Sequence, residues 1–169
     1  MNKKIVVTGG TGFIGSALVR RLVADGYSVR VFDNDSRGSV TRLHDIRNDI
    51  EIITGDIRDA DAVARAMAGQ DAVWHLAYVN GTRFFYEKPD LVLDVGVKGM
   101  INVIEACRLH NLSELVYAST SEVYQTPAVV PTPEDIQMIV PDPTNPRYSY
   151  GGGKIIGELM TSSTVTTSR

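Results

Sequence analysis

The first two dozen residues place a glycine-rich turn directly between a strand pattern and a helix pattern. Residues 4–7 include the β-branched run Ile5, Val6 and Val7, which is typical of a buried strand. The segment 8–15, with the sequence TGGTGFIG, follows at once, and apolar residues at helical spacing continue over 16–24. A chain that passes from strand through a tight turn into a helix is predicted to open with a βαβ unit.

Each glycine of this turn has its own physical reason. Gly9 permits the tight turn, Gly12 lets a pyrophosphate approach the backbone because it has no Cβ, and Gly15 lets the helix pack close to the strand. The free N–H groups and the dipole at the helix start favour phosphate charge. The turn therefore predicts a dinucleotide-binding loop, and the alternative is a purely structural turn.

An acidic residue stands where such a loop requires one. Residues 28–32 are predicted to form the second strand, and Asp33 ends it, 18 residues after Gly15. A carboxylate there accepts hydrogen bonds from the adenosine ribose and repels a 2′-phosphate. Asp33 therefore favours NAD over NADP, a preference that nearby Arg37 weakens. The alternative is an ordinary acidic turn residue within 33–38.

The bulk composition argues against several function classes. The chain has 169 residues, of which 43% are hydrophobic, and fits one globular domain. A net charge of −3 gives no general attraction to nucleic acid or membranes, and no apolar run approaches the ~20 residues of a membrane span. The single cysteine, Cys107, rules out an internal disulfide framework, and no metal-ligand spacing occurs. A reducing, cytoplasmic setting is expected.

Strand and helix patterns alternate along the rest of the chain. Further strands are predicted over 50–54, 71–77 and 114–119, and helices over 59–68, over 91–109 and from near Tyr150. Parallel neighbours need crossover connections, so the pattern predicts an α/β fold with a doubly wound parallel sheet, the Rossmann architecture. Ligands of such sheets bind beyond the carboxyl ends of the strands.

Tyr150 and Lys154 form the most distinctive pair of titratable residues. Residues four apart on a helix share a face, and a lysine cation beside a phenol lowers its pKa from about 10. The resulting phenolate can remove a proton from an alcohol whose hydride leaves. The three glycines between the pair make a poor intrinsic helix, which suggests close approach of a ligand or of backbone. The alternative is a pair on a helix surface.

Polar residues also follow the fifth predicted strand, at the edge of the sheet that faces ligands. The hydroxyl of Thr120 can hydrogen-bond a reacting oxygen, and the carboxylate of Glu122 can act as acid or base on a neighbouring carbon. The alternative is that small polar residues only end the strand. His75, at the end of the fourth strand, is expected to be a structural hydrogen-bonding residue.

Together these residues resemble the extended short-chain dehydrogenase/reductase superfamily, in particular its NAD-dependent nucleotide-sugar epimerase/dehydratase branch. The matching segments, in order along about 1–160, are 8–15, 33–38, 55–59, 75–77, 119–124 and 150–154. The resemblance implies an enzyme whose substrate is a nucleotide-diphosphate sugar. Its shared step is oxidation of the hexose at carbon 4, with hydride passing to NAD and a transient 4-keto intermediate.

The resemblance also implies a role for each matching residue. The pyrophosphate would be bound by Gly9, Thr11, Gly12, Phe13 and Ile14, and the adenosine ribose would be held by Asp33, Asn34, Arg37 and Gly38. The adenine would lie between Asp56 and Ile57. The nicotinamide side would be lined by Leu76, Ala77 and Tyr78. Tyr150 is implied as the base and Thr120 as the hydroxyl that orients the sugar. Lys154 is implied as the partner that lowers the pKa of Tyr150 and as a ligand of the nicotinamide ribose.

Departures from the family pattern bear on the choice of reaction. Ser121 replaces the aspartate in the Thr-Asp-Glu of 4,6-dehydratases, so dehydration is disfavoured. Thr-Ser-Glu is similar to UDP-uronate decarboxylases, while many epimerases carry Ser-Glu, and we rank an epimerase first and a decarboxylase second. Gly96 and Met100 stand where the family has asparagine and threonine in its fourth helix, and a glycine there is expected to loosen that helix.

The chain is roughly half as long as members of this branch. Residues 1–160 are interpreted as a truncated NAD-binding Rossmann domain without the last strands and the C-terminal substrate domain, and 161–169, almost purely Ser and Thr, as a disordered tail. The family implies a homodimer through 91–109 and 150–160. The alternative of another class is a catalytically silent NAD-binding or sensing domain, which would have no need of Tyr150, Lys154 and Thr120.

Overall fold

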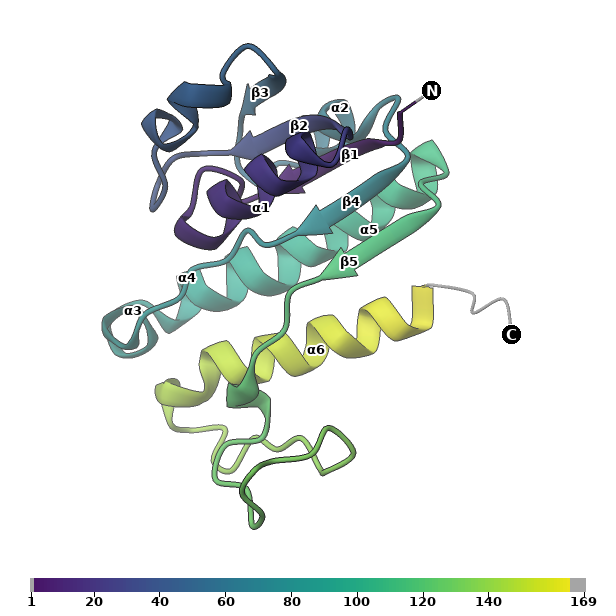
Figure 1. Cartoon of the computed structure of the whole chain (residues 1–169). Helices are drawn as coiled ribbons and strands as arrows, with labels where there is room; N and C mark the ends of the chain where they lie inside the picture. The colour runs from purple at the N-terminus through teal and green to yellow at the C-terminus, as the bar shows by residue number, and fades with distance from the viewer. Residues whose placement is uncertain (1, 165–169) are drawn as a thin grey trace.

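Five strands form one parallel sheet in the computed structural model, which describes residues 2–164 (Figure 1). The strand order is β3-β2-β1-β4-β5, so the chain steps outward from β1 in both directions, as in a doubly wound sheet. The strands are β1 (Lys4–Thr8), β2 (Ser28–Asp33), β3 (Ile50–Thr54), β4 (Ala72–His75) and β5 (Glu114–Tyr117). The predicted α/β class and parallel topology are confirmed.

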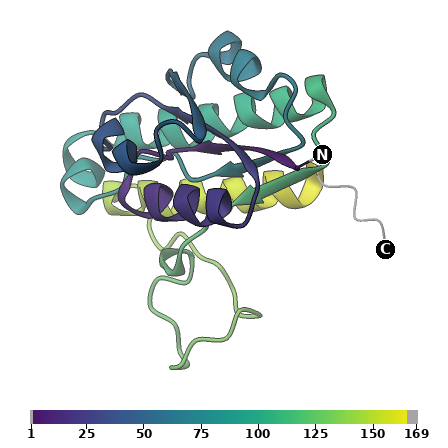
Figure 2. The ribbon, with the colours of Figure 1, turned by 45° about the horizontal axis from the view of Figure 1, so that its top comes forward.

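Helices cover both faces of the sheet (Figure 2). On one face, α1 (Phe13–Ala24) and the 3-10 segment η1 (Val40–Ile46) close a core with Val7, Val31 and Leu43. On the other face, α2 (Ala60–Met67) and α5 (Gly99–His110) pack over Val6 and Val73. Alternate residues of each strand therefore supply two separate cores, which explains why the strands are apolar on both sides.

The long helix predicted over 91–109 is interrupted. It consists of α4 (Pro89–Leu93), the π-helical segment η2 (Asp94–Lys98) and α5, and the short helix α3 (Thr82–Glu87) precedes it. Gly96 lies in η2, where an added Cβ would overlap the phenol oxygen of Tyr78. The glycine that departs from the family pattern thus makes room for a tyrosine, and the helix there takes a wider turn.

The last described helix, α6 (Ser149–Thr164), runs beside α5 and contacts the edge strand β5 (Figure 1). The expectation of a disordered tail from residue 161 is wrong for its first four residues, which continue this helix. Hydroxyl groups of Thr161 and Ser163 donate to the carbonyls of Gly157 and Met160, so these side chains bond back to the helix that they extend. Residues 165–169 lie outside the described part of the chain.

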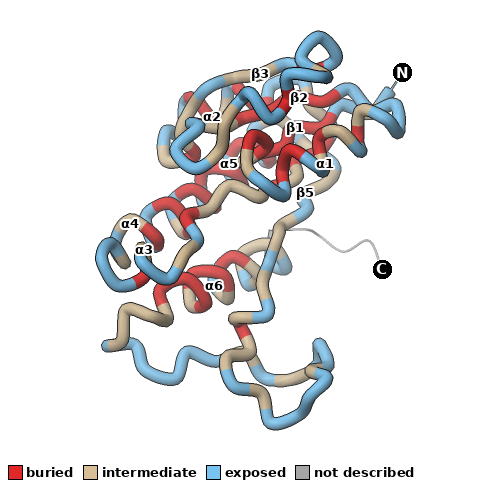
Figure 3. Tube along the Cα trace, turned by 60° about the vertical axis from the view of Figure 1, so that its left-hand side comes forward, coloured by how far each residue is buried: buried red, intermediate tan, exposed pale blue. Residues whose placement is uncertain are grey.

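The connection between β5 and α6 is long and mostly exposed, and it projects away from the sheet (Figures 2 and 3). It begins with the 3-10 turn η3 (Ser121–Val123) and ends with η4 (Pro146–Tyr148), directly before α6. β4 and β5 are two residues shorter at their carboxyl ends than predicted, so residues 76–78 and 118–120 leave the sheet. Within residues 2–164, none of the helices combines the length and hydropathy that crossing a bilayer requires.

Asp59 provides a test of how α2 begins. Its carboxylate accepts a hydrogen bond from the Ala62 N–H at 3.0 Å, so Asp59 is the N-cap of α2. We expect Asp59→Ala to lower the free energy of unfolding by about 1 kcal/mol, because a helix-start N–H loses its partner. Asp59→Asn keeps an acceptor and should match the wild type. Urea denaturation measures both, and equal losses in the two variants would contradict the capping role.

Candidate active site

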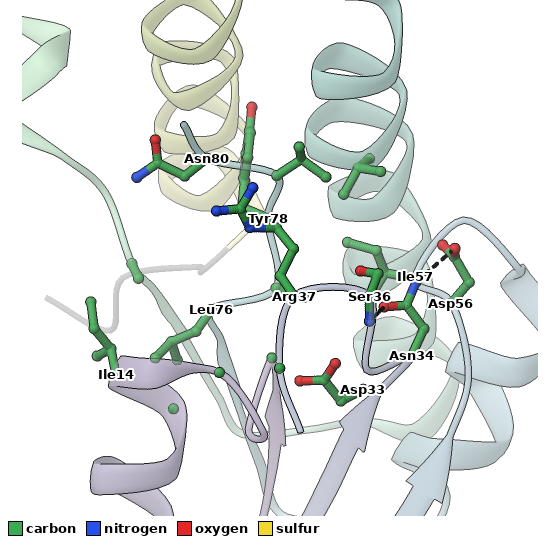
Figure 4. A pocket seen from close by; sticks show the side chains of 18 of the residues that line it. Ile14, Asp33, Asn34, Ser36, Arg37, Asp56, Ile57, Leu76, Tyr78 and Asn80 are labelled. Carbon is green, nitrogen blue, oxygen red and sulfur yellow. Dashed lines mark hydrogen bonds between the residues drawn. The ribbon is translucent and has the colours of Figure 1, made fainter. Parts of the chain in front are cut away.

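A pocket of about 550 Å³ lies beyond the carboxyl ends of the parallel strands (Figure 4). Most of the residues proposed above for cofactor binding line it together: Gly9, Gly12, Phe13, Ile14, Asp33, Asn34, Arg37, Gly38, Asp56, Ile57, Leu76, Ala77, Tyr78, Tyr150 and Lys154. Thr11 and Glu122 are not among the lining residues, and Thr120 borders a second hollow beside the first. The fold therefore gathers the glycine turn and the Tyr–Lys pair, which are far apart in sequence, around one cavity.

The glycine turn is fixed by close backbone contacts. Gly9 has a φ of +73°, and a Cβ there would lie 2.7 Å from the Ala77 nitrogen in the segment after β4. The Gly9 N–H donates to the Phe32 carbonyl at 2.9 Å, so the turn is tied to β2 as well. A side chain at this position would push apart the ends of three strands.

The start of α1 is suited to a phosphate. Its N-cap residue, Gly12, offers no side-chain cap, and its first turn contains no acidic residue. The first N–H groups of a helix without a cap need another acceptor, and the helix dipole makes an anion the favoured one. Gly12, Phe13 and Ile14 line the pocket, so a pyrophosphate fits this end of it.

Asp33 lines the pocket just beyond the strand ends and is held firmly (Figure 4). One of its carboxylate oxygens accepts from the Thr11 N–H at 3.0 Å and the other from the Asp35 N–H at 2.9 Å. Each oxygen can still accept a further bond, as ribose hydroxyls would require. Thr11 itself is fully buried, so its place in the structure is behind the pocket, where it orients Asp33.

The part of the pocket lined by Asn34, Asp56 and Arg58 contains an ion pair that the sequence did not predict. Arg58 lies 2.8 Å from Asp56 and 3.2 Å from Asp94 of η2, and Asn34 donates to Asp56 at 3.1 Å. The Arg58 hydrogen bond lowers the pKa of Asp56 to about 2. The carboxylate is thus ionised and fixed in place. The sequence carried no signal for the Arg58–Asp94 contact, because it joins segments 36 residues apart.

Arg37 reaches across the pocket and not toward Asp33. Its guanidinium lies 4.9 Å from the ring centroid of Phe84 on α3, and its side chain points toward Tyr78 (Figure 4). A cation over a ring face is attracted by the ring's quadrupole, so Arg37 bridges the loop after β2 and α3. In this position the charge of Arg37 is directed away from the carboxylate of Asp33.

Tyr150 is buried near the start of α6, against an aromatic neighbour. Phe85 stacks on it with a centroid distance of 5.2 Å, and Arg147 lies over Phe85 at 5.3 Å. Burial raises the pKa of Tyr150, a hydrogen bond with Thr120 lowers it, and the charge of Glu122 raises it, for a net increase. The expected lowering by Lys154 is not found here, because the ammonium lies 5.9 Å from the Tyr150 ring centroid and donates to the Ala118 carbonyl.

Glu122 has a different partner from the one that its proposed role requires. Its carboxylate forms an ion pair with Arg147 at 2.7 Å, and Arg147 in turn lies over the ring that stacks on Tyr150. The geometry therefore favours Glu122 as part of the support behind Tyr150. The contribution of Arg147 and Phe85 was missed, since a cation and a ring 62 residues apart in sequence form no recognisable pattern.

His75 has the structural role expected for it. Its Nδ1 shares a hydrogen bond of 2.6 Å with the Thr8 hydroxyl, and burial lowers its pKa to about 3, so it is neutral. Among residues 2–164, no group of three or more histidine, cysteine or acidic side chains is arranged to hold a metal ion.

Lys154 makes the stability of the fold depend on pH. Burial lowers its pKa from 10.5 to about 8, so between these values the unfolded chain binds more protons and the free energy of unfolding rises with pH. We expect the wild type to gain about 1 kcal/mol per pH unit relative to Lys154→Met between about pH 8 and 10. Urea denaturation across this range measures the difference, and parallel curves for the two proteins would contradict it.

The chain matches the model of the NAD dependent epimerase/dehydratase family over residues 5–167. It is 36% identical over 160 residues to a UDP-glucose 4-epimerase of Mycolicibacterium smegmatis, an alignment that covers 92% of this chain and 49% of that protein. It is 32% identical over 160 residues to a UDP-N-acetyl-alpha-D-glucosaminuronate decarboxylase of Bacillus cytotoxicus, with 95% and 49% covered.

Solved structures give the same result. The UDP-glucose 4-epimerase of Thermus thermophilus, crystallised in complex with NAD, superimposes with a TM-score of 0.82 at 31% identity, covering 95% of this chain and 50% of that one. The chain thus spans about half the length of the relatives it matches. The family match over nearly all of the chain and the shared Rossmann fold establish that this protein belongs to the NAD-dependent epimerase/dehydratase family.

Proposed function

We propose that this chain provides the NAD-binding and proton-transfer half of an enzyme that epimerises a nucleotide-diphosphate sugar at carbon 4. The observation that supports the proposal is one pocket whose lining includes the start of α1, Asp33, Tyr150 and Lys154. The epimerase assignment draws on the relatives, several of which are UDP-glucose 4-epimerases. UDP-hexoses are therefore the first substrates to test.

Different groups of pocket residues are proposed to bind different parts of NAD. The N–H groups at the start of α1 bind the pyrophosphate, and Asp33 accepts hydrogen bonds from the adenosine ribose. Leu76, Ala77 and Tyr78 line the same pocket, as does Tyr150, and they are proposed to face the nicotinamide. When bound there, NAD⁺ supplies a hydride acceptor for carbon 4 of the sugar and a positive charge next to Tyr150.

Tyr150 is the proposed base, and it acts on the sugar hydroxyl at carbon 4. Burial and the charge of Glu122 raise its pKa, so proton removal depends on nearby positive charge and on the hydrogen bond from Thr120. The ammonium of Lys154 lies 5.9 Å from the ring centroid and does not lower the Tyr150 pKa in this structure, so its proposed contribution is to bind the nicotinamide ribose. Thr120 orients the hydroxyl, and the Glu122–Arg147 pair holds the turn that carries Thr120.

A uronate decarboxylase is the second candidate. It is favoured by the sequence Thr120-Ser121-Glu122 and by the relative from Bacillus cytotoxicus. The two candidates share the oxidation at carbon 4 and differ in the fate of the keto sugar. Incubation with UDP-glucose and, separately, with a UDP-uronate distinguishes them: interconversion of the hexose supports the epimerase, and release of CO₂ supports the decarboxylase.

Homodimer formation is part of this proposal. α5 and α6 carry large apolar side chains on the surface, including Leu109 and Leu159, which are 66% and 67% exposed. Ile101 and Ile156 are also partly exposed on the same two helices. Light scattering on the purified chain measures the state directly.

Cofactor affinity tests the binding half of the proposal. Titration calorimetry with NAD⁺, on protein shown by circular dichroism to be folded, should give saturable binding. We expect Asp33→Ala to weaken it about tenfold or more, because hydrogen bonds to a charged acceptor are lost. Asp35→Ala makes the same charge change in the same loop, outside the residues that line the pocket, and should leave affinity unchanged. Equal effects of the two changes would refute the role of Asp33.

Turnover tests the catalytic half. Tyr150→Phe removes only the phenol oxygen, so it should lower the rate by about 10²-fold or more while NAD⁺ affinity stays the same. The rate is followed as interconversion of UDP-glucose and UDP-galactose. A wild-type chain that binds NAD⁺ without turnover on any UDP-sugar would favour a silent binding domain, as would a Tyr150→Phe variant as active as the wild type.

A further inference from the structure

Two tyrosine hydroxyl groups near the pocket are buried without a hydrogen-bond partner. They belong to Tyr78, in the segment after β4, and Tyr117, the last residue of β5. A buried hydroxyl without a partner is costly, so a different part of each side chain must account for its position. In both cases the ring lies against the ammonium of Lys154.

The ammonium of Lys154 lies between these two rings. Its Nζ is 4.3 Å from the ring centroid of Tyr78 and 4.5 Å from that of Tyr117, closer than the 5.9 Å to Tyr150. It also donates to the carbonyl of Ala118. Two ring faces and one carbonyl therefore surround a cation whose residue is only 3% exposed.

Glycines of α6 make this arrangement possible. A Cβ at position 153 would overlap the Tyr78 phenol oxygen, and one at position 157 would overlap that of Tyr117. Gly153 and Gly157 are one helical turn apart and flank Lys154, so each tyrosine sits over a glycine of the helix that carries the lysine. The glycines that weaken α6 thus have a packing reason.

The other titratable groups around Lys154 are consistent with a held cation. Burial keeps the phenols of Tyr78 and Tyr117 neutral by raising their pKa, and His75, stacked on Tyr117 at 5.8 Å, is neutral as well. Glu158, four residues along α6, is the acidic group whose charge raises the pKa of Lys154, against the larger effect of burial. The rings and the carbonyl therefore provide the remaining stabilisation of the charge.

We propose that Tyr78 and Tyr117, seated on Gly153 and Gly157, form an aromatic clamp that fixes the ammonium of Lys154 beside Tyr150. They are positioning residues, since they act through Lys154. The ring faces hold the charge, and the hydroxyls do not take part. The catalytic consequence rests on the function proposed above, whereas the clamp itself can be tested without cofactor or substrate.

The test measures the protonation of Lys154 directly. The full chain is labelled with lysine enriched in ¹³C at Cε, its resonances are followed by NMR as a function of pH, and Lys154→Met identifies the signal. The wild-type pKa should be about 8. Tyr117→Leu keeps an apolar cover but removes the ring, so the pKa should fall by about one pH unit. Tyr117→Phe keeps the ring and should match the wild type. An unchanged pKa in the leucine variant would overturn the clamp.

A second pair of variants tests the proposal even if the leucine variant does not fold. Replacing Tyr117 by 3,4,5-trifluorophenylalanine keeps the shape of phenylalanine and weakens the negative ring face. The Lys154 pKa should then lie below that of Tyr117→Phe, and equal values would again overturn the proposal. NAD⁺ calorimetry adds the functional readout, with about tenfold weaker binding expected for Tyr117→Leu than for Tyr117→Phe.

The two proposals fail in different ways. If Lys154 of the wild-type chain titrates as expected but the chain does not bind NAD⁺, the proposed function is contradicted and the clamp proposal is unaffected. If the chain binds NAD⁺ but the Lys154 pKa is the same with and without a ring at position 117, only the clamp proposal is contradicted.

Glycine substitutions on α6 test the close contacts between the clamp tyrosines and the glycines of this helix. Gly157→Ala should lower the melting temperature, because its Cβ meets the Tyr117 ring, and should shift the Lys154 pKa. Gly152→Ala is the matched control, since its nearest neighbour is a Val140 methyl at an ordinary 3.4 Å. It should raise the melting temperature by about 3 °C through helix propensity alone. Thermal unfolding by circular dichroism compares them, and a rise in both would contradict close packing at 157.

Discussion

The site depends on the parallel register of three neighbouring strands. Thr8 of β1 is paired with His75 of β4, and His75 with Tyr117 of β5, so three polar or aromatic residues stand at one level on one face. The Thr8–His75 hydrogen bond and the His75–Tyr117 stack follow from that alignment. A shift of one residue in either pairing would send these side chains to the opposite face. The ends of the three strands therefore position the Tyr117 ring that lies against Lys154, independently of the contacts made by α6.

Burial of one cation connects the fold to the proposed chemistry. Lys154 loses most of its hydration, and the protein replaces it with ring faces, one carbonyl and the distant charge of Glu158. Tyr150 loses hydration as well, so its pKa rises in this structure. Tyr150, the proposed base, and Lys154 are thus both destabilised in their charged forms, and a positive charge that a ligand brings next to Tyr150 would favour its phenolate.

Several site features could be predicted because their cause is local. The turn at Gly9 and Gly12 and the acid at the end of β2 have a short-range geometric reason, and they reached the pocket as expected. Thr11 and Glu122 do not line the pocket. The Thr11 N–H is bound by the Asp33 carboxylate, and the Glu122 carboxylate is bound by the Arg147 guanidinium, and both partners are distant in sequence. The tail prediction failed over 161–164, where side chains that hydrogen-bond their own helix offset a polar composition.

The sequence by itself determined the class of fold and the chemical types present at the site. Hydrophobic periodicity and turn residues act over a few positions, so they specify strands, helices and the glycine loop without knowledge of the partners. Only the tertiary structure decided which ring faces Lys154, why α6 tolerates its glycines, and that Gly96 accommodates Tyr78. Those features are contacts between residues 18 to 76 positions apart, and their energies depend on burial and on distances that appear only when the chain has folded.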